Sequence, residues 1–328
     1  MTMSRRSMIR QGLAGLAALS AGPAVAAGFG RPNSRIGDLQ IGVISYSFRS
    51  MKDQSAEAIL GYCRQLGINA IELMGDPVEW FAGIPIRFDN SQHRQILKSS
   101  APGKPDYEAE MARFGEYRRA AAAWRAQVPM ERFAQLRQLY ERAGVQIYAF
   151  KPSAFETDST DAEIDYGMRA ARALGADQAT VELPGDLAQV RRLTVAGRRR
   201  GLRVAFHEHT GATPTLWDAA LAVSPAAAIN LDLGHYIAAD DYDGIEFIRR
   251  HHARIASMHL KDRRNRPHGQ ANMPWGQGDT PIVAALQLMR EQHYGFPATI
   301  ELEYEIPAGS DAVTEVGRCL DYCRKALT

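Results

Sequence analysis

Cysteine is scarce in this sequence, and its usage excludes one class of protein. The 328 residues include three cysteines, Cys63, Cys319 and Cys323, an odd number that fits no disulfide framework. The last two are at i and i+4 on an expected helix, where side chains neighbour each other but rarely bridge. We therefore expect all three to pack as small core residues.

An excess of charge of one sign is also missing. The sequence has 39 basic residues against 37 acidic ones, which leaves a formal net charge of +2. Binding to nucleic acid or to an acidic membrane needs clustered cations. The near balance therefore argues against a nucleic-acid partner.

No apolar run is suited to a stable membrane span, but the N-terminus has the pattern of an export signal. The run Gly12–Val25 is short and rich in Ala and Gly. It follows an arginine pair within Ser4–Arg10 and precedes an Ala-Val-Ala cleavage pattern ending at Ala26. We predict that residues 1–27 are a bacterial twin-arginine signal peptide, with a periplasmic or exported mature chain that has no stable membrane insertion. An uncleaved anchor or a chance arginine pair is the alternative.

Residues 28–328 alternate strand-like and helix-like patterns to the end of the chain. One helix pattern, Ser55 to Leu66, is closed by Gly67. Parallel strands need crossover helices, and a closed sheet has no exposed edge. We therefore predict one α/β domain, a single (β/α)8 TIM barrel. Its strands are expected at Ile41–Phe48, Asn69–Met74, Val145–Phe150, Gln178–Leu183, Arg203–His209, Ala228–His235, Ile255–Asp262 and Ala298–Tyr304.

Two long connections interrupt this rhythm. About 70 residues separate the second and third strands, where a crossover needs only a dozen or more. The stretch Asp76 to Pro105 is rich in Pro and Gly, and Tyr107 to Gln127 predicts a charged helix. We expect residues 76–127 to be a lid-like insertion over the barrel mouth, or else a plain surface excursion. The second connection, Lys261 to Pro281, offers Arg263, His268 and Trp275 to a polar ligand.

Metal-competent side chains lie at the ends of several expected strands. The stretch Ile229–Tyr236 alternates apolar and polar residues and then presents Asp232 and His235. The carboxyl ends of barrel strands carry the chemistry of this fold. A lone acid or histidine there is often structural, but burying so many ionisable groups without a cation would be costly. Oxygen and imidazole donors together suit a divalent ion such as Mn, Mg, Co or Zn. The other members are Glu182, His207, His209, His259, Glu301 and Glu303.

Four motifs in chain order carry a resemblance. They are Asp-Leu-Gly-His (232–235), His-Leu-Lys-Asp (259–262), Gly-Gln-Gly-Asp (276–279) and Ile-Glu-Leu-Glu (300–303). Together they resemble the xylose isomerase-like TIM barrel superfamily, which includes sugar phosphate isomerases/epimerases, ketose 3-epimerases, inosose dehydratases and endonuclease IV. The similarity runs from Ile41 to the C-terminus, with the specific motifs in the second half.

The resemblance implies a metal set of Glu, Asp, His and Glu from strands five to eight. Asp232, His259 and Glu301 match the last three positions. The strand-five position has His207 instead of a glutamate, and alternation puts Glu208 on the other face. We expect Glu182, one strand earlier, to be the remaining ligand, with His207 as the close second.

The resemblance and this geometry imply a metal-dependent sugar isomerase or epimerase that works through a metal-stabilised enediolate. Glu182, Glu301 or His207 would move the proton. The expected contacts to the carbohydrate substrate are His209, His235, Lys261, Arg263 and Trp275.

Other functions stay open at this stage. A lyase or dehydratase acting on keto-sugars or 3-keto-glycosides is the main alternative, because of His207 and the exported location. An endonuclease IV-like phosphodiesterase would need further histidines on strands two and three, which end in Glu72-Leu73-Met74 and Ala149-Phe150-Lys151. A non-catalytic exported sugar-binding protein would need no metal. A homo-oligomer is compatible with the sequence.

Overall fold

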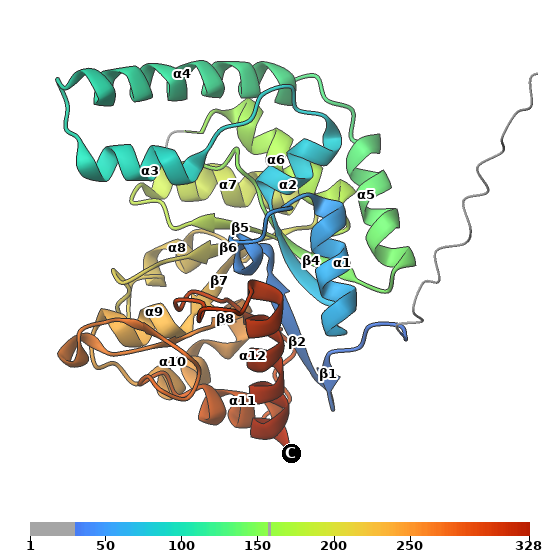
Figure 1. The fold of residues 1–328 in the computed structure, drawn as a ribbon, viewed down its shortest axis with the longest axis vertical. Coiled ribbons are helices and arrows are strands. Elements are labelled where there is room, and N and C mark those ends of the chain that lie inside the picture. Colours follow the sequence, from blue (N-terminus) through green and yellow to red (C-terminus); the bar gives the residue numbers. More distant parts are fainter. Residues whose placement is uncertain (1–29, 157–158) are drawn as a thin grey trace, which may run out of the picture.

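The computed structural model describes residues 30–156 and 159–328, and the predicted signal peptide lies outside them. Eight parallel strands form a barrel that the β2–β3 and β2–β11 pairings close, as predicted (Figure 1). A short strand β1 (Arg35–Ile36) pairs antiparallel with β2 outside the ring. The barrel strands are β2 (Leu39–Ile44), β3 (Ala70–Met74), β4 (Gln146–Lys151), β5 (Gln178–Glu182), β6 (Arg203–His207), β7 (Ala227–Asp232), β8 (Ile255–Leu260) and β11 (Ala298–Ile300).

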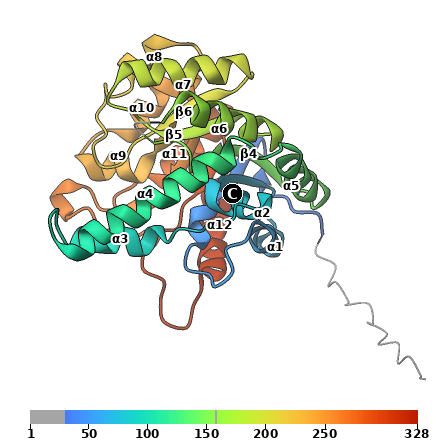
Figure 2. The ribbon, with the colours of Figure 1, turned by 90° about the horizontal axis from the view of Figure 1, so that it is seen from above.

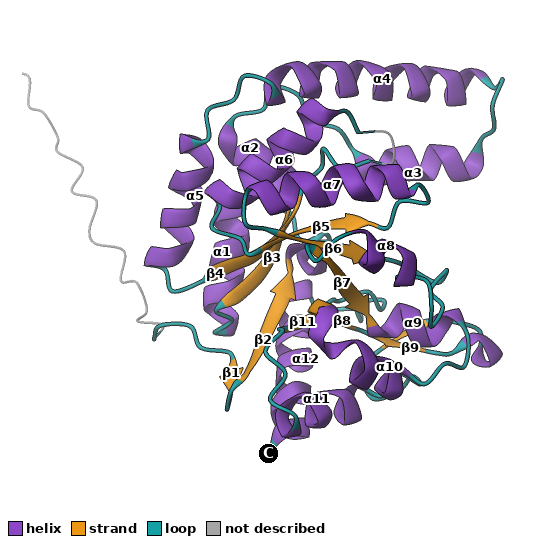
Figure 3. Ribbon diagram, turned by 180° about the vertical axis from the view of Figure 1, so that it is seen from behind, coloured by secondary structure: helices purple, strands orange, loops and turns teal. Residues whose placement is uncertain are grey.

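Helices surround the barrel, and their ends follow local signals in the sequence (Figure 3). The Ser55 side chain accepts a hydrogen bond from the Ala58 N–H at the start of α1, and Gly67 ends this helix with a φ of 71°. Thr160 and Glu163 form a capping box at α6. The helices outside the long connection are α1 (Ala56–Leu66), α6 (Asp161–Ala173), α7 (Leu187–Arg199), α8 (Asp218–Val223), α9 (Leu233–Ala239), α10 (Gly244–His251), α11 (Ile282–Glu291) and α12 (Ala312–Leu327).

The connection between β3 and β4 is more helical than its composition suggests. It contains α2 (Gly75–Ala82), α3 (Asn90–Ser99), α4 (Pro105–Arg125) and α5 (Glu131–Arg142). Pro77 and Pro105 both lie in the first turn of a helix, where proline costs no hydrogen bond. Helices α3 and α4 lie side by side as a hairpin (Figures 1 and 2). The proline and glycine residues therefore mark helix starts and ends.

A buried ion pair fixes this connection to the barrel. Arg125 Nε and Nη2 lie 2.8 and 3.0 Å from the two carboxylate oxygens of Glu79, which joins α4 to α2. The Tyr166 hydroxyl of α6 donates to the same carboxylate at 2.9 Å. Glu79 and Arg125 are both buried. These contacts hold α2 and α4 in one position relative to the barrel wall.

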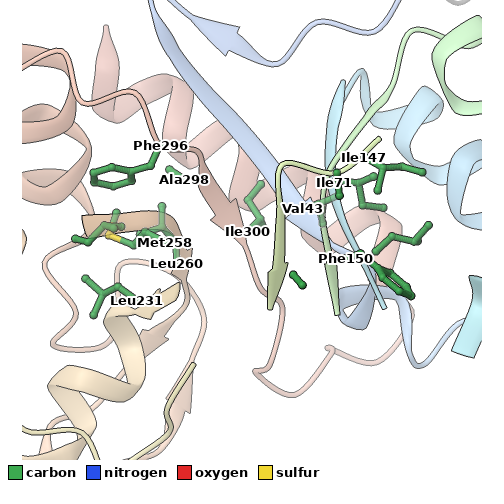
Figure 4. Close-up of a cluster of buried hydrophobic side chains, with 14 of the residues drawn as sticks. Val43, Ile71, Ile147, Phe150, Leu231, Met258, Leu260, Phe296, Ala298 and Ile300 are labelled. Carbon is green, nitrogen blue, oxygen red and sulfur yellow. The ribbon is translucent and has the colours of Figure 1, made fainter. Parts of the chain in front are cut away.

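The hydrophobic core lies between the strands and the outer helices. Figure 4 shows part of it, with Val43, Ile71, Phe150, Met258 and Ile300 among the labelled side chains. All five are buried, as are the three cysteines, which are free thiols as predicted. No helix within residues 30–156 and 159–328 combines the length and apolar character that a membrane crossing requires.

Six of the eight strands end earlier than the sequence pattern predicts, and β2, β7 and β11 do so by three residues or more. A 3-10 helix, η1 (Ser45–Phe48), replaces the second half of the first expected strand. Strand β7 ends at Asp232, and α9 starts at Leu233. Strand β11 ends at Ile300, so Glu301 and Glu303 lie beyond it. Periodicity alone does not separate a strand end from a following turn of similar apolar content.

Candidate functional site

Asp232 stands at the junction of β7 and α9, and its two oxygens have different surroundings. Its Oδ1 accepts a hydrogen bond from the His235 N–H at 2.8 Å and caps α9. Its Oδ2 is buried and lies 2.8 Å from the Lys261 ammonium nitrogen. Burial raises the pKa of Asp232 to about 7, against the opposing effect of the Lys261 ammonium.

His259 on β8 is held between carboxylates. Its Nε2 lies 2.8 Å from Glu72 Oε2 on β3, and its Nδ1 lies 3.2 Å from Glu301 Oε2 and 4.0 Å from Asp232 Oδ2. Burial alone would lower the pKa of His259, but Glu72 and Glu301 outweigh it and raise the pKa to about 10. The Glu72 contact fixes the ring so that Nδ1 faces Asp232 and Glu301.

Lys261 places an ammonium group among three carboxylates. Its Nζ lies 2.8 Å from Asp232 Oδ2, 2.9 Å from Glu301 Oε2 and 2.8 Å from Glu303 Oε2. The side chain is 2% exposed, and the three carboxylates raise its pKa in spite of the burial. A β-carbon on Gly234 would lie 2.4 Å from Lys261 Cγ, so a glycine is needed there for this close approach. The buried cluster therefore already accommodates a cation.

His207 extends the cluster toward β6. Its Nδ1 lies 2.7 Å from Asn230 Oδ1, which leaves Nε2 for another partner. The ring centroid of His207 lies 5.3 Å from that of His259 and 4.8 Å from that of His209. His207, Asp232 and His259 each offer a ligand atom within 4.8 Å of the others. Burial, followed by the nearby Lys151 ammonium, lowers the pKa of His207 well below its usual value, which favours the neutral form.

Glu182 belongs to a second group at the rim. Its Oε1 accepts from Lys151 Nζ at 2.6 Å, and its Oε2 lies 3.6 Å from His209 Nδ1. Glu182, His207 and His209 also offer ligand atoms within 4.8 Å of one another. The Glu182 side chain is 44% exposed, whereas that of Asp232 is fully buried. His207 thus lies between the buried group and the rim group.

The predicted substrate contacts differ in where they lie. His235 stacks edge-on to His209 at 4.7 Å, and Arg263 donates to His235 Nδ1 and to the Gln270 carbonyl. Burial and Lys261 lower the pKa of His235 to about 2, so its ring is neutral. Trp275 instead packs edge-on to Tyr322 of α12 at 5.8 Å. Within the described residues, no hydrogen bond or ring contact joins Trp275 to the histidines.

Asp262 fixes the loop that follows β8. One of its oxygens accepts from the N–H groups of Gly276, Gln277 and Gly278 at 2.7–3.1 Å. The other oxygen accepts from the Thr280 N–H at 3.2 Å. The loop includes the short hairpin of β9 (Asp262–Arg263) and β10 (Asn272–Met273) and the 3-10 turn η3 (Arg266–His268). Arg263 follows Asp262 directly in β9, so the hydrogen bonds of Asp262 also help to position the Arg263 side chain that contacts His235.

The donor set fits a divalent cation. Asp232 Oδ2, His259 Nδ1 and Glu301 Oε2 are buried and lie close together, and their partners are one another and the Lys261 ammonium. Carboxylates buried together are costly without positive charge beside them. Two carboxylate oxygens and one imidazole nitrogen match the ligands that Mn, Zn and related ions take, and Glu72 supplies the outer carboxylate that orients the histidine.

Two residues of this arrangement, Glu72 and Asn230, were not predicted from the sequence. Glu72 is fully buried on β3 and bonds to His259 across 187 residues of chain. Asn230 on β7 contacts His207, Ser257 and Glu72. Each stands inside an apolar strand pattern, and such a polar residue must find a partner when it is buried. That signal marks both residues but does not identify their partners.

Solved structures of sugar-modifying and related proteins share the fold. A sugar phosphate isomerase/epimerase from Parabacteroides distasonis is 14% identical, with 90% of this chain and 98% of that chain covered and a TM-score of 0.55. A probable 3-DHS dehydratase from Bacillus anthracis is 14% identical, with 86% and 99% covered and a TM-score of 0.56. A D-allulose 3-epimerase from Methylomonas sp. is 14% identical, with 88% and 98% covered and a TM-score of 0.56.

Sequence comparison places the chain in a family. No curated protein matches it in such a comparison. The family model described as xylose isomerase-like TIM barrel matches residues 109–323, which include most of α4 and all the strands from β4 onward. The chain therefore belongs to the xylose isomerase-like TIM barrel family.

Proposed function

We propose that the protein is a divalent-metal-dependent sugar isomerase or epimerase that moves a proton next to a carbonyl group. The observation that carries this proposal is the convergence of Asp232 Oδ2, His259 Nδ1 and Glu301 Oε2 in one buried cluster. His259 Nδ1 lies 3.2 Å from Glu301 Oε2 and 4.0 Å from Asp232 Oδ2, and the Lys261 ammonium already pairs with both carboxylates. The family and its isomerase, epimerase and dehydratase neighbours agree with this reaction class.

Asp232, His259 and Glu301 would hold the metal, and His207 is the fourth ligand that the geometry favours. His207 is buried and groups with Asp232 and His259, whereas Glu182 is half-exposed and bonded to Lys151. Glu182 as a ligand remains the alternative. When bound, a divalent ion such as Mn, Mg, Co or Zn makes the carbon acid between a carbonyl and a hydroxyl group easier to ionise.

Two carboxylates lie on opposite sides of the barrel mouth. Glu301 follows β11 and Glu182 ends β5, and these strands are four apart in the ring of eight. A carboxylate on each side of a sugar carbon can remove a proton from one face and return it to the other. This placement supports epimerisation, with Glu301 and Glu182 as the two proton carriers.

The remaining polar side chains would orient the substrate. His209 is exposed at the rim and lies beside His235, whose neutral ring is held by Arg263. A neutral imidazole can donate one hydrogen bond and accept another, which suits vicinal hydroxyl groups. Lys261 already neutralises three carboxylates, so we assign it to the balance of charge and to one substrate oxygen. Trp275 as a substrate contact remains a proposal that would require the loop after β8 to move.

A lyase or dehydratase is the second candidate, and one contact favours it. His209 Nδ1 lies 3.6 Å from Glu182 Oε2 at the exposed rim. An imidazole beside a carboxylate can protonate a departing hydroxyl or glycosyl oxygen. After the same first proton removal, this pair would direct the reaction to elimination. Substrates would then be keto-sugars or 3-keto-glycosides.

Deuterium exchange tests the shared first step. The manganese-loaded protein is mixed in D₂O with a panel of ketoses and 3-keto-glycosides and followed by proton NMR. We expect loss of the signal next to the carbonyl, with a new epimer for the main proposal and an unsaturated product for the second. Asp232→Asn should lower the exchange rate at least about 100-fold, whereas the matched surface variant Asp321→Asn should not. Equal rates for both variants, or no exchange with any sugar, would contradict the proposal.

A further inference from the structure

A cavity of about 830 Å³ lies at the part of the barrel rim where β2 and β3 end. Ser45 and Tyr46 at the end of β2 and Met74 at the end of β3 form its floor. The β3–β4 connection supplies most of the rest of its lining, from α2, α3, α4 and the loop between α2 and α3. The remainder comes from Arg49, Ser50, Gln54 and Ile59. Its volume is in the range of small-molecule binding pockets.

Arginine dominates the charge of this cavity. Four arginines and two aspartates line it, which gives an excess of two positive charges. Both aspartates are engaged: Asp76 accepts from Ser153 Oγ at 2.7 Å and from Asn90 Nδ2 at 3.2 Å, and Asp89 accepts from the Gln92 N–H at 2.9 Å. The aspartates therefore leave the excess positive charge in place.

Three of the arginines lack an acidic partner. Arg113 pairs with Glu110 at 2.9 Å. For Arg49, Arg87 and Arg94, no carboxylate within 4.0 Å is found in residues 30–156 and 159–328. Guanidinium groups bind carboxylate and phosphate through two parallel hydrogen bonds. Three unmatched guanidinium groups around one cavity form a receptor for an anion.

Aromatic rings hold two of these guanidinium groups in place. The Arg87 guanidinium lies 4.7 Å from the ring centroid of Trp80, and that of Arg49 lies 4.3 Å from the centroid of Tyr46. Stacking uses the face of the guanidinium group and leaves the N–H groups at its edge able to donate. In Arg49, Nη1 already donates to the carbonyls of Tyr46 and Leu302. The side chains of Arg49 and Arg87 are therefore partly fixed in position before an anion binds.

The cavity is joined to the proposed metal ligands by short contacts. Arg49 Nη1 donates to the Leu302 carbonyl at 2.5 Å, and Leu302 stands between Glu301 and Glu303. The Ser47 hydroxyl also bonds to the Leu302 N–H at 3.0 Å. A ligand in the cavity would thus lie next to the segment that carries Glu301.

We propose that this cavity is a subsite for an anionic substituent of the substrate, remote from the reacting carbons. The proposal rests on the proposed function and deepens it by naming the substrate class as an acidic saccharide. The anion is a carboxylate or a phosphate group, bound by Arg87 and Arg94 with support from Arg49. The reacting part of the sugar lies toward Glu301 and His259.

Isothermal titration calorimetry tests the subsite directly on the manganese-loaded full chain. The probes are D-galacturonate for the carboxylate, D-glucose 6-phosphate for the phosphate, and neutral D-glucose. We expect at least one anionic probe to bind about 10-fold or more tightly than glucose. Arg87→Gln and Arg94→Gln together should weaken its binding about 10-fold. Arg64→Gln, an exposed arginine of α1, is the matched control and should leave the affinity unchanged.

The outcomes separate this subsite from the proposed reaction. Selective anion binding that is lost in the Arg87 and Arg94 variant supports the subsite, even if no sugar exchanges deuterium. The preferred probe then identifies carboxylate or phosphate. Equal affinity for anionic and neutral probes, binding that survives both substitutions, or no binding of any probe would overturn it. Proton exchange on neutral ketoses, with neither anionic probe bound more tightly than glucose, would overturn the subsite and leave the reaction standing.

Discussion

Two parts of the same barrel rim carry different kinds of polar side chain. The part formed by β6, β7, β8 and β11 has buried histidines and carboxylates, with one lysine that contacts three of the acids. The part formed by the ends of β2 and β3 and by the β3–β4 connection has arginines stacked on aromatic rings in a wide cavity. Buried groups in fixed contact suit proton transfer and metal binding, whereas accessible guanidinium groups suit recognition of a ligand. The two proposals therefore assign the reaction to the first part of the rim and the recognition of the substrate to the second.

We expect the largest effect on stability from the Glu79–Arg125 ion pair, which joins α4 to α2 beside the cavity. Arg125→Met would leave the Glu79 carboxylate buried without its cationic partner, with only the Tyr166 hydroxyl beside it among the described side-chain donors. We expect the free energy of unfolding to fall by about 3–5 kcal/mol, measured by urea denaturation. The double variant Glu79→Gln/Arg125→Met should recover part of this loss. A single variant as stable as the wild type would mean that α4 is not fixed by this pair.

The next largest effect is expected on metal affinity, and it distinguishes His207 from Glu182 as the fourth ligand. His207→Gln removes an imidazole grouped with Asp232 and His259, and Glu182→Gln removes a half-exposed carboxylate. We expect His207→Gln to weaken Mn²⁺ binding about 100-fold and Glu182→Gln by less than about 10-fold. Calorimetric titration of both variants measures this. The reverse order would make Glu182 the fourth ligand and His207 a substrate contact.

We expect the smallest effect from Lys261, whose ammonium group lies among the proposed metal ligands. Lys261 Nζ lies within 2.9 Å of the carboxylate oxygens of Asp232 and Glu301. Its positive charge opposes a second cation at the same oxygens, so Lys261→Met should tighten Mn²⁺ binding about 10-fold. Lys151→Met, which removes a cation bonded to Glu182, is the control and should change this affinity less. Weaker binding in Lys261→Met would mean that the lysine helps to place the ligands.

The barrel was predictable from the sequence because each strand is a short local pattern. The eight strands follow from apolar runs and their spacing, and the Gly67 stop follows from one residue. Helix α3 was missed because Asn90–Ser99 has few apolar residues, and its packing on α4 decides its structure. Local propensity is too weak to predict such a helix.

The candidate site was only partly predictable for a related reason. Asp232 and His259 stand in neighbouring strands, so their proximity follows from the barrel. The contact of Glu72 with His259 crosses the barrel interior, and strand order alone does not specify it. Two of the three unmatched arginines of the cavity, Arg87 and Arg94, come from a connection whose path no strand pattern fixes. Chemistry at strand ends is predictable from spacing, whereas contacts across the barrel or from long connections require the structure.

Export by the twin-arginine route and an insertion that covers the barrel mouth are separate proposals. The first rests on residues 1–27 and the second on residues 76–127, and neither segment supplies a ligand of the proposed metal site.

The most direct test of the central claim is the metal content of the purified protein. Wild type, Asp232→Asn and His259→Gln are dialysed against Mn²⁺, and the bound metal is measured by mass spectrometry. We predict about one ion per wild-type chain, and affinity at least about 100-fold lower in both variants. A wild-type chain without bound metal, or variants that bind it as tightly as the wild type, would contradict the account.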